Sequence, residues 1–184
     1  MASSAQRMPL RRVLPNAATR AWVNPISPTR EKNSASHEIW DDDGAGFSWC
    51  GGGVYHHDLA SDKQECWVPD AQARHNMVSP DEKYVVYDVA PGKWWRGCPW
   101  NVKFYNRETK RTVEVYSTRP ALFPESRPSR LHPDPHPHFV CQGRYVVSTA
   151  NTACGTMELF VTPVDQLVAQ TTTLAPSGSA SGGK

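Results

Sequence analysis

The stretch HNMVSPDEKYVVYDV, residues 75–89, occurs in this chain in three related copies. HEIWDDDGAGFSW (37–49) and HPHFVCQGRYVVSTA (136–150) superimpose on it without gaps across their first halves. In every copy a histidine stands seven residues before a turn position. The histidines are His37, His75 and His136, and the turn positions are Gly44, Glu82 and Gly143. This internal similarity predicts a repeated structural unit.

Further strand-like runs follow each copy. They are GVYHHDLASDKQECWV (53–68), WNVKFYNRETKRTVEVYS (100–117) and MELFVTPVDQLV (157–168), and each is expected to form a pair of strands. The runs are rich in Val, Tyr, Phe and Trp between Gly, Pro, Asp and Asn turn signals, and no window sustains a long amphipathic helix. We therefore expect an all-β fold whose repeat is one four-stranded propeller blade.

The number of repeats predicts an incomplete propeller. The chain supplies three blades and part of a fourth, whereas closed propellers typically contain about four to eight. We expect this partial β-propeller of about three to four blades over residues 20–170. Residues 1–19 are expected to be a poorly ordered extension and 171–184 a disordered Ser/Gly-rich tail. The open edges of such a propeller would permit self-association.

Composition excludes several classes of partner. The 184 residues carry 20 Lys+Arg against 18 Asp+Glu, and the charges are interspersed, so a basic footprint for nucleic acid is missing. The sequence has no run that is long and apolar enough to suggest a membrane span. The five cysteines are odd in number and form no C-x-x-C pair, which favours free thiols over disulfides or a zinc ribbon. We expect a cytoplasmic protein that binds a small molecule.

Three histidines at one position of successive blades would meet near the propeller axis. Since equivalent blade positions lie at equivalent radii, His37, His75 and His136 are expected at the central channel. His138 lies two residues beyond His136 and faces the same side if the strand is extended. Imidazole suits several transition metals, and added oxygen ligands favour harder ions such as Mn²⁺. We take His75, His136 and His138 as candidate metal ligands; alternatively, the histidines cap strand ends or bind backbone carbonyls.

The same segments carry a family resemblance. SHEIWDDDG, ARHNMVSPDEKYVVYD and HPHFVCQGRYVVSTANTACGTMELFVTPVDQL resemble the C-terminal blades of oligogalacturonate lyases. The resemblance covers about residues 20–167. It implies that the chain is a fragment of a seven-bladed propeller. It also implies that His75, His136 and His138 hold a manganese ion.

The sequence departs from the family pattern at two positions. The family has a glutamine ligand three residues before the first histidine of H-x-H, where this chain has Pro133. Asp134 or His132 is open as its replacement. Glu82 stands where the family turn continues with glycine, a change that affects the geometry of the hairpin.

The resemblance also implies a reaction. Such enzymes cleave short pectin-derived uronides by β-elimination, in which a metal ion neutralises the uronate carboxylate and so makes the C5 proton more acidic. An arginine acts as the base in the family, and TRAWVN (19–24) looks like the strand that bears it. Arg20 is therefore the candidate base, and a salt bridge is its alternative role.

Three more residues are candidates for substrate contacts. His37 and Glu38 would face the channel and orient the sugar or a water, with His37 catalytic and Glu38 substrate-binding. GKWWRGCPW (92–100) surrounds Arg96 with tryptophans. Aromatic faces beside a guanidinium can bind a sugar ring and its carboxylate, so Arg96 is a second substrate-binding candidate. Alternatively, this segment covers the outer surface of its blade.

Taken together, these observations predict an oligogalacturonate lyase-like protein of pectin catabolism. It would bind a small oligouronide and Mn²⁺ or another divalent metal. The alternative is a truncated, catalytically inactive propeller fragment that serves as a binding or interaction scaffold. A third class, a binding propeller without a metal, would show no dependence of its stability on metal ions.

Overall fold

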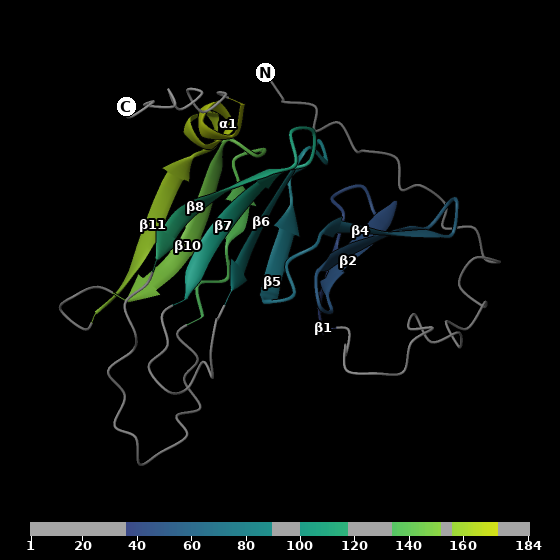
Figure 1. Cartoon of the computed structure of the whole chain (residues 1–184), viewed down its shortest axis with the longest axis horizontal. Helices are drawn as coiled ribbons and strands as arrows, with labels where there is room; N and C mark the ends of the chain where they lie inside the picture. Colours follow the sequence, from purple (N-terminus) through teal and green to yellow (C-terminus); the bar gives the residue numbers. More distant parts are fainter. Residues whose placement is uncertain (1–35, 90–99, 118–133, 152–155, 173–184) are drawn as a thin grey trace, which may run out of the picture. The chain divides into compact units, whose positions relative to one another are not determined.

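The computed structural model describes residues 36–89, 100–117, 134–151 and 156–172 (Figure 1). The chain divides into two units, Met1–Asn33 and Ser34–Lys184, and all of the described residues lie in the second. They form three antiparallel sheets and a helix. The predicted N-terminal extension and most of the predicted tail lie outside the described residues.

Each sheet corresponds to one predicted repeat. Blade 1 has the strand order β1 (Ser36–Trp40), β2 (Gly46–Cys50), β3 (Val54–Asp58), β4 (Lys63–Val68). Blade 2 has the order β5 (Ala73–Val78), β6 (Tyr84–Val89), β7 (Asn101–Asn106), β8 (Arg111–Ser117). Blade 3 has the order β9 (His138–Val140), β10 (Tyr145–Asn151), β11 (Met157–Pro163). The all-β fold and the partial propeller are thus confirmed.

The strand register confirms that the three copies superimpose without gaps. The paired residues are Ile39↔Ser48 in blade 1, Met77↔Val86 in blade 2 and His138↔Val147 in blade 3. In all three blades the partner lies nine residues further along the chain. The first hairpin therefore has the same register in every blade, although the turn of blade 3 has two further left-handed residues, Cys141 and Gln142.

In every blade, the residue seven positions after the histidine has a left-handed backbone conformation. Gly44, Glu82 and Gly143 have φ values of 69°, 56° and 80°. Glycine adopts such a φ without steric cost, whereas a residue with a Cβ pays about 1–2 kcal/mol. Blade 2 therefore places a glutamate side chain at a position where the other two blades have glycine.

Irregular pairing at the start of the inner strands places the histidines. In blade 1 the register shifts between Ser36 and Ile39, and in blade 2 it shifts between Ala73 and Asn76. His37 and His75 lie within these shifts. A bulge re-aims side chains relative to regular pleating, so both imidazoles can leave the alternation of their strands.

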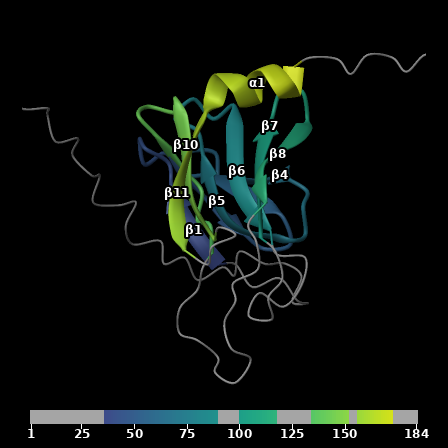
Figure 2. The ribbon, with the colours of Figure 1, turned by 90° about the vertical axis from the view of Figure 1, so that its left-hand side faces the viewer.

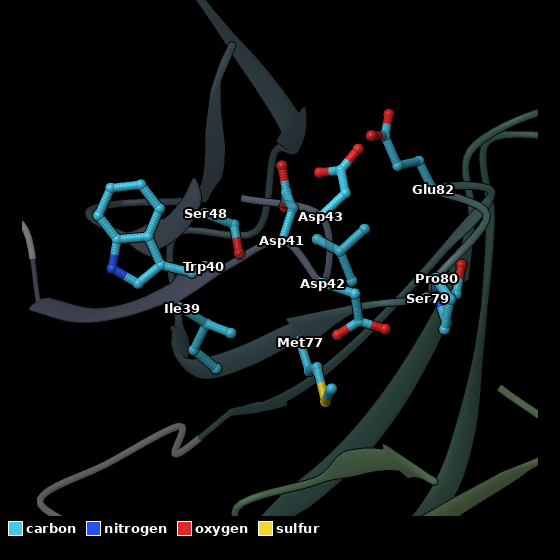
Figure 3. Close-up of a pocket in the computed structure, with 11 residues that line it drawn as sticks. Ile39, Trp40, Asp41, Asp42, Asp43, Ser48, Met77, Ser79, Pro80 and Glu82 are labelled. Carbon is cyan, nitrogen blue, oxygen red and sulfur yellow. The ribbon is translucent and has the colours of Figure 1, made fainter. Parts of the chain in front are cut away.

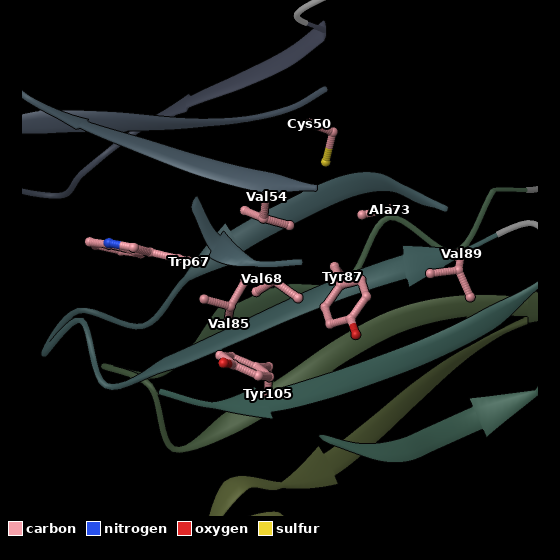
Figure 4. Close-up of a cluster of buried hydrophobic side chains, with 9 residues drawn as sticks. All are labelled: Cys50, Val54, Trp67, Val68, Ala73, Val85, Tyr87, Val89 and Tyr105. Atoms are coloured by element: carbon pink, nitrogen blue, oxygen red, sulfur yellow. The ribbon is translucent and has the colours of Figure 1, made fainter. Parts of the chain in front are cut away.

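Blades 1 and 2 share a hydrophobic core (Figure 4). Its residues are Cys50, Val54, Trp67 and Val68 from blade 1 and Ala73, Val85, Tyr87, Val89 and Tyr105 from blade 2. Along β6, Val85, Tyr87 and Val89 alternate with residues that point the other way, as the two-residue period of a strand requires. Strand β6 is therefore covered on both faces.

Blade 3 packs on the opposite face of blade 2. Val86 and Phe104 of blade 2 meet Phe139 and Val146 of blade 3 in a second buried cluster. Helix α1 (Val164–Thr172) adds Val164 and Leu167 to it. Figure 2 shows α1 lying across the ends of the strands of blades 2 and 3.

The helix corrects one prediction. MELFVTPVDQLV was expected to form a pair of strands, but it forms β11 followed by α1. Val164, Leu167 and Thr171 are buried, a spacing that follows the helical period. Asp165 lies in the first turn, where a negative charge is favourable. The helix also includes Thr171 and Thr172, which the sequence analysis assigned to the tail.

Blade 3 leaves an apolar face uncovered. Met157, Leu159 and Val161 are large exposed apolar residues at alternate positions of β11. By the shared register Val161, paired with Val147, is equivalent to Phe104, paired with Val86. Phe104 is fully buried beneath blade 3, whereas Val161 is 57% exposed. This face of blade 3 thus has the chemistry of a surface that another blade covers.

No helix among the described residues has the length and apolar character needed to cross a bilayer.

Candidate metal centre

Histidines from three blades lie together. The ring centroids of His37 and His75 are 4.1 Å apart, and those of His75 and His136 are 3.7 Å apart. The rings of His37 and His136 are separated by 6.5 Å. His37 comes from β1, His75 from β5, and His136 from the segment that leads into β9. The position shared by the three repeats therefore converges on one place.

A buried carboxylate of β6 orients two of these histidines. Asp88 is 0% exposed and accepts the backbone N–H of His75 at 2.9 Å and that of His136 at 3.2 Å. Its Oδ2 also lies 2.9 Å from Nδ1 of His75. Because a carboxylate accepts, Nδ1 of His75 carries the proton in this contact and the lone pair is on Nε2. Ligating histidines in metalloproteins commonly have such a partner.

A second carboxylate lies beside the free nitrogen of His75. Oδ2 of Asp134 is 3.8 Å from Nε2 of His75 and 3.7 Å from Nε2 of His136. His75, Asp134 and His136 offer ligand atoms that all lie within 4.8 Å of one another. Atoms that bind one ion at about 2.0–2.2 Å are at most about 4.4 Å apart, and both distances from Asp134 are within that limit. Two imidazoles and a carboxylate therefore fit a divalent transition metal ion such as Mn²⁺.

The pKa shifts of the pocket histidines differ in direction. Burial lowers the pKa of His37 and of His138, and neighbouring histidines lower both further. The hydrogen bond to Asp134 raises the pKa of His136 against the effect of burial. Asp134 thus favours the protonated form of His136, and an ion would compete with that proton. Burial raises the pKa of the Cys50 thiol to about 12, so this thiol is protonated in the metal-free protein.

A pocket of about 210 Å³ lies beside the three histidines. Its walls include His37, Glu38, His75, His136 and His138. Five of the seven predicted site residues thus lie together. The other two, Arg20 and Arg96, lie outside the described residues.

His138 lines the pocket but is not a member of the group with Asp134. It was expected to face the same side as His136 because the two are two residues apart on an extended strand. However, His136 has a φ of 41°, and β9 begins only at His138. The alternation of an extended strand therefore does not apply between them. Of the two replacements left open for the family glutamine, Asp134 lies at the site, and His132 lies outside the described residues.

The sequence analysis missed Asp88. Its signal was an acid inside the run YVVYDV, in a strand that is otherwise apolar or aromatic. An acid that is fully buried in such a strand needs partners, and here they are the backbone and ring of His75 and the backbone of His136.

Fold and site together define a class: a β-propeller of several blades with a histidine and carboxylate pocket on its inner strands. No protein-family model matches the chain, and no curated protein matches it in sequence.

Solved structures identify the fold more closely. The chain is similar to oligogalacturonate lyase in complex with manganese, with a TM-score of 0.52 and 17% identity over 72% of this chain. It spans 36% of the length of that lyase. A second oligogalacturonate lyase, from Vibrio parahaemolyticus, matches with a TM-score of 0.49 and 18% identity, over 75% of this chain and 38% of that chain. The resemblance indicated by the sequence motifs is thus found in the fold.

Proposed function

We propose that this chain is an oligogalacturonate lyase-like, Mn²⁺-dependent protein that cleaves short pectin-derived uronides by β-elimination. The observation that carries the proposal is the group formed by His75, Asp134 and His136, backed by the buried Asp88. The similarity of the fold to a manganese-bound lyase supports it.

Each residue has a distinct task in this proposal. His75, Asp134 and His136 hold the ion, and Asp88 keeps Nε2 of His75 unprotonated toward it. When bound, the ion supplies Lewis acidity, which makes the C5 proton of a uronate easier to remove. His37 has a lowered pKa, so its neutral ring can accept a hydrogen bond or a proton from the sugar or a water.

The remaining assignments have separate sources: the pocket lining gives His138, the blade repeat Glu38, the family resemblance Arg20, and the tryptophan-rich segment Arg96. His138 and Glu38 contribute polar groups to the pocket wall, where a sugar hydroxyl can bind. Arg20 is proposed as the base that takes the C5 proton, and Arg96 as the group that binds a uronate carboxylate.

Asp134 changes the charge of the site. A carboxylate carries one more negative charge than the glutamine of the family pattern, so it strengthens the attraction for a cation. It also weakens the attraction between the centre and the carboxylate of a uronate. We therefore expect tight metal binding together with slower turnover than a glutamine ligand would give.

The thiols support a cytoplasmic location. Cys50, Cys66 and Cys141 are free, as is usual in a reducing compartment.

The test is a continuous ultraviolet assay for unsaturated uronate on di- and trigalacturonate, first with Mn²⁺ and then with a chelator. Product formation should require the ion and disappear in His136→Ala. The matched control is His57→Gln in β3, outside the pocket, which should keep activity. A folded, metal-binding protein that forms no product would favour the alternative of an inactive binding scaffold.

A further inference from the structure

A second group of metal-ligating side chains lies away from the pocket of His75. It consists of Asp41, which follows β1, His56 of β3 and Glu82 in the turn between β5 and β6. Their ligand atoms all lie within 4.8 Å of one another. Two of the residues belong to blade 1 and the third to blade 2.

Two of the three ligands are buried and held in place. Nε2 of His56 and Oδ2 of Asp41 are 2.8 Å apart, and their side chains are only 8% and 9% exposed. The ring of His56 stacks on Trp67, with a centroid distance of 3.8 Å and an interplanar angle of 12°. Because this stacking fixes the imidazole plane, Nε2 stays directed at Asp41. Little ordering would be needed to bind an ion there, but the ion must replace the proton that Nε2 donates to Asp41.

Gly46 is needed because these atoms approach its backbone closely. A Cβ at this position would lie 2.5 Å from Oδ2 of Asp41, 2.6 Å from the backbone oxygen of His57 and 2.8 Å from Nε2 of His56. Any other residue would therefore push Asp41 and His56 out of their present positions.

A small pocket adjoins Asp41 and Glu82 (Figure 3). Its volume is about 90 Å³, and Asp42 and Asp43 also line it. In Figure 3 the carboxylates of Asp41, Asp43 and Glu82 lie on the same side of the pocket. At about 30 Å³ per water, the pocket has room for roughly three waters. Three side chains and three waters would complete the six ligands common for Mn²⁺-like ions.

The local charge favours a cation. Asp41, Asp42 and Asp43 are consecutive acids at the pocket. The positive group nearest to Glu82 is Arg107, whose Nη1 is 4.0 Å from Oε2 of Glu82. Its guanidinium also lies over the ring of Trp67. Arg107 thus offsets part of the charge of Glu82 and leaves the three aspartates facing the pocket.

We propose that Asp41, His56 and Glu82 form a second divalent cation site that joins blade 1 to blade 2. One imidazole with two carboxylates suits Mn²⁺ or Zn²⁺ better than Ca²⁺, which prefers oxygen ligands alone. The role is structural, since the ion would hold the turn of blade 2 against the inner strands of blade 1. The proposal does not depend on lyase activity or on the pocket of His75.

The test is isothermal titration of the metal-free full chain with Mn²⁺. Glu82→Gln is the decisive variant, because it leaves the buried pair of Asp41 and His56 intact. It should bind one equivalent of Mn²⁺ less than the wild type, or bind that equivalent at least about tenfold more weakly. His56→Gln should lose the same equivalent. Asp165→Asn on α1, outside both groups, should bind as the wild type does.

His136→Ala separates this site from the first. This variant should lose the Mn²⁺ ion bound at His75 and should still bind the Mn²⁺ ion whose binding depends on Glu82. The proposal is overturned if folded Glu82→Gln and wild type bind Mn²⁺ with equal stoichiometry and affinity. It is also overturned if His136→Ala alone removes all binding, because the residual site would then not exist.

Discussion

Replacing Asp88 by asparagine tests how the first metal centre is organised. The asparagine has the same shape, but it presents one oxygen and one NH₂ group where the carboxylate presents two oxygens. Asp88 accepts three hydrogens, from the backbone of His75, the backbone of His136 and Nδ1 of His75. In Asp88→Asn at least one of these donors must face the NH₂ group.

The expected losses can be worked from these contacts. A buried donor without a partner costs about 1–3 kcal/mol of folding free energy, and the lost charge of the acceptor adds to it. Removing the carboxylate partner of a ligating histidine weakens metal binding by about 10- to 100-fold, which is about 1.4–2.7 kcal/mol. We therefore expect Asp88→Asn to be destabilised and to bind Mn²⁺ at His75 about 10- to 100-fold more weakly.

Two measurements separate the effects. Chemical denaturation of the metal-free protein gives the loss of stability, and titration with Mn²⁺ at a temperature where the variant is folded gives the affinity. Asp165→Asn on the exposed face of α1 is the matched control; it should leave the Mn²⁺ affinity unchanged and lower the stability only by the helix-dipole contribution of about 0.3–1 kcal/mol. A folded Asp88→Asn whose Mn²⁺ affinity lies within about twofold of wild type would refute the view that Asp88 orients His75 for the ion.

Three further outcomes follow from contacts outside the centre. Thr171→Val should lower the free energy of unfolding by about 1–3 kcal/mol in a denaturant titration, because it leaves Nδ2 of Asn106 without its buried acceptor. Burial tends to raise the pKa of Asp70, but hydrogen bonds, chiefly from Lys103, lower it overall. Because the folded pKa is below the unfolded one, Asp70→Asn should be less stable than wild type at pH 7, and the difference should shrink as the pH falls below about 4. Leu159, 66% exposed on the uncovered face of blade 3, should promote self-association, so sedimentation velocity should detect oligomers in the wild type at high concentration but not in Leu159→Lys.

Each of these three predictions has a result that would contradict it, and the Thr171 prediction also has a control variant in α1. Thr172→Val, at an exposed position of α1, should be nearly neutral. If it costs as much as Thr171→Val, the bond to Asn106 is not the cause. An Asp70→Asn variant whose stability differs from wild type equally at pH 7 and pH 3 would contradict the assignment to Lys103. A wild type that stays monomeric over about a hundredfold range of concentration would exclude association through blade 3.

The repeat could be predicted because the signals of a propeller blade are local. The spacing from each histidine to Gly44, Glu82 or Gly143 sets the hairpin, and the register of the structure follows it in all three blades. The apolar alternation of β6 likewise predicts which residues are buried. Since equivalent positions of a repeat lie at equivalent places in the fold, the meeting of His37, His75 and His136 also follows from the sequence.

Features that depend on contacts between distant residues could not be predicted. The helix α1 is only nine residues long, and its burial depends on blades 2 and 3. Asp134 is close in sequence to His136, but its distance from His75 depends on how blade 3 packs on blade 2. The left-handed φ of His136 changes the direction of its ring, and it could not be predicted because the following Pro137 favours an extended backbone at His136.

The origin of the candidate site residues would link ion binding to the assembly of the blades. Asp88 and His75 belong to blade 2, whereas Asp134 and His136 precede blade 3, so the ligands are close only while the two sheets are docked. The packing of Phe139 against Phe104 thus sets the entropy cost of assembling the site. By the same linkage, free metal concentration would act on the sheet interface as a ligand acts on a folding equilibrium. The interface between blades 2 and 3 would be most stable where divalent ions are abundant and least stable where they are scarce.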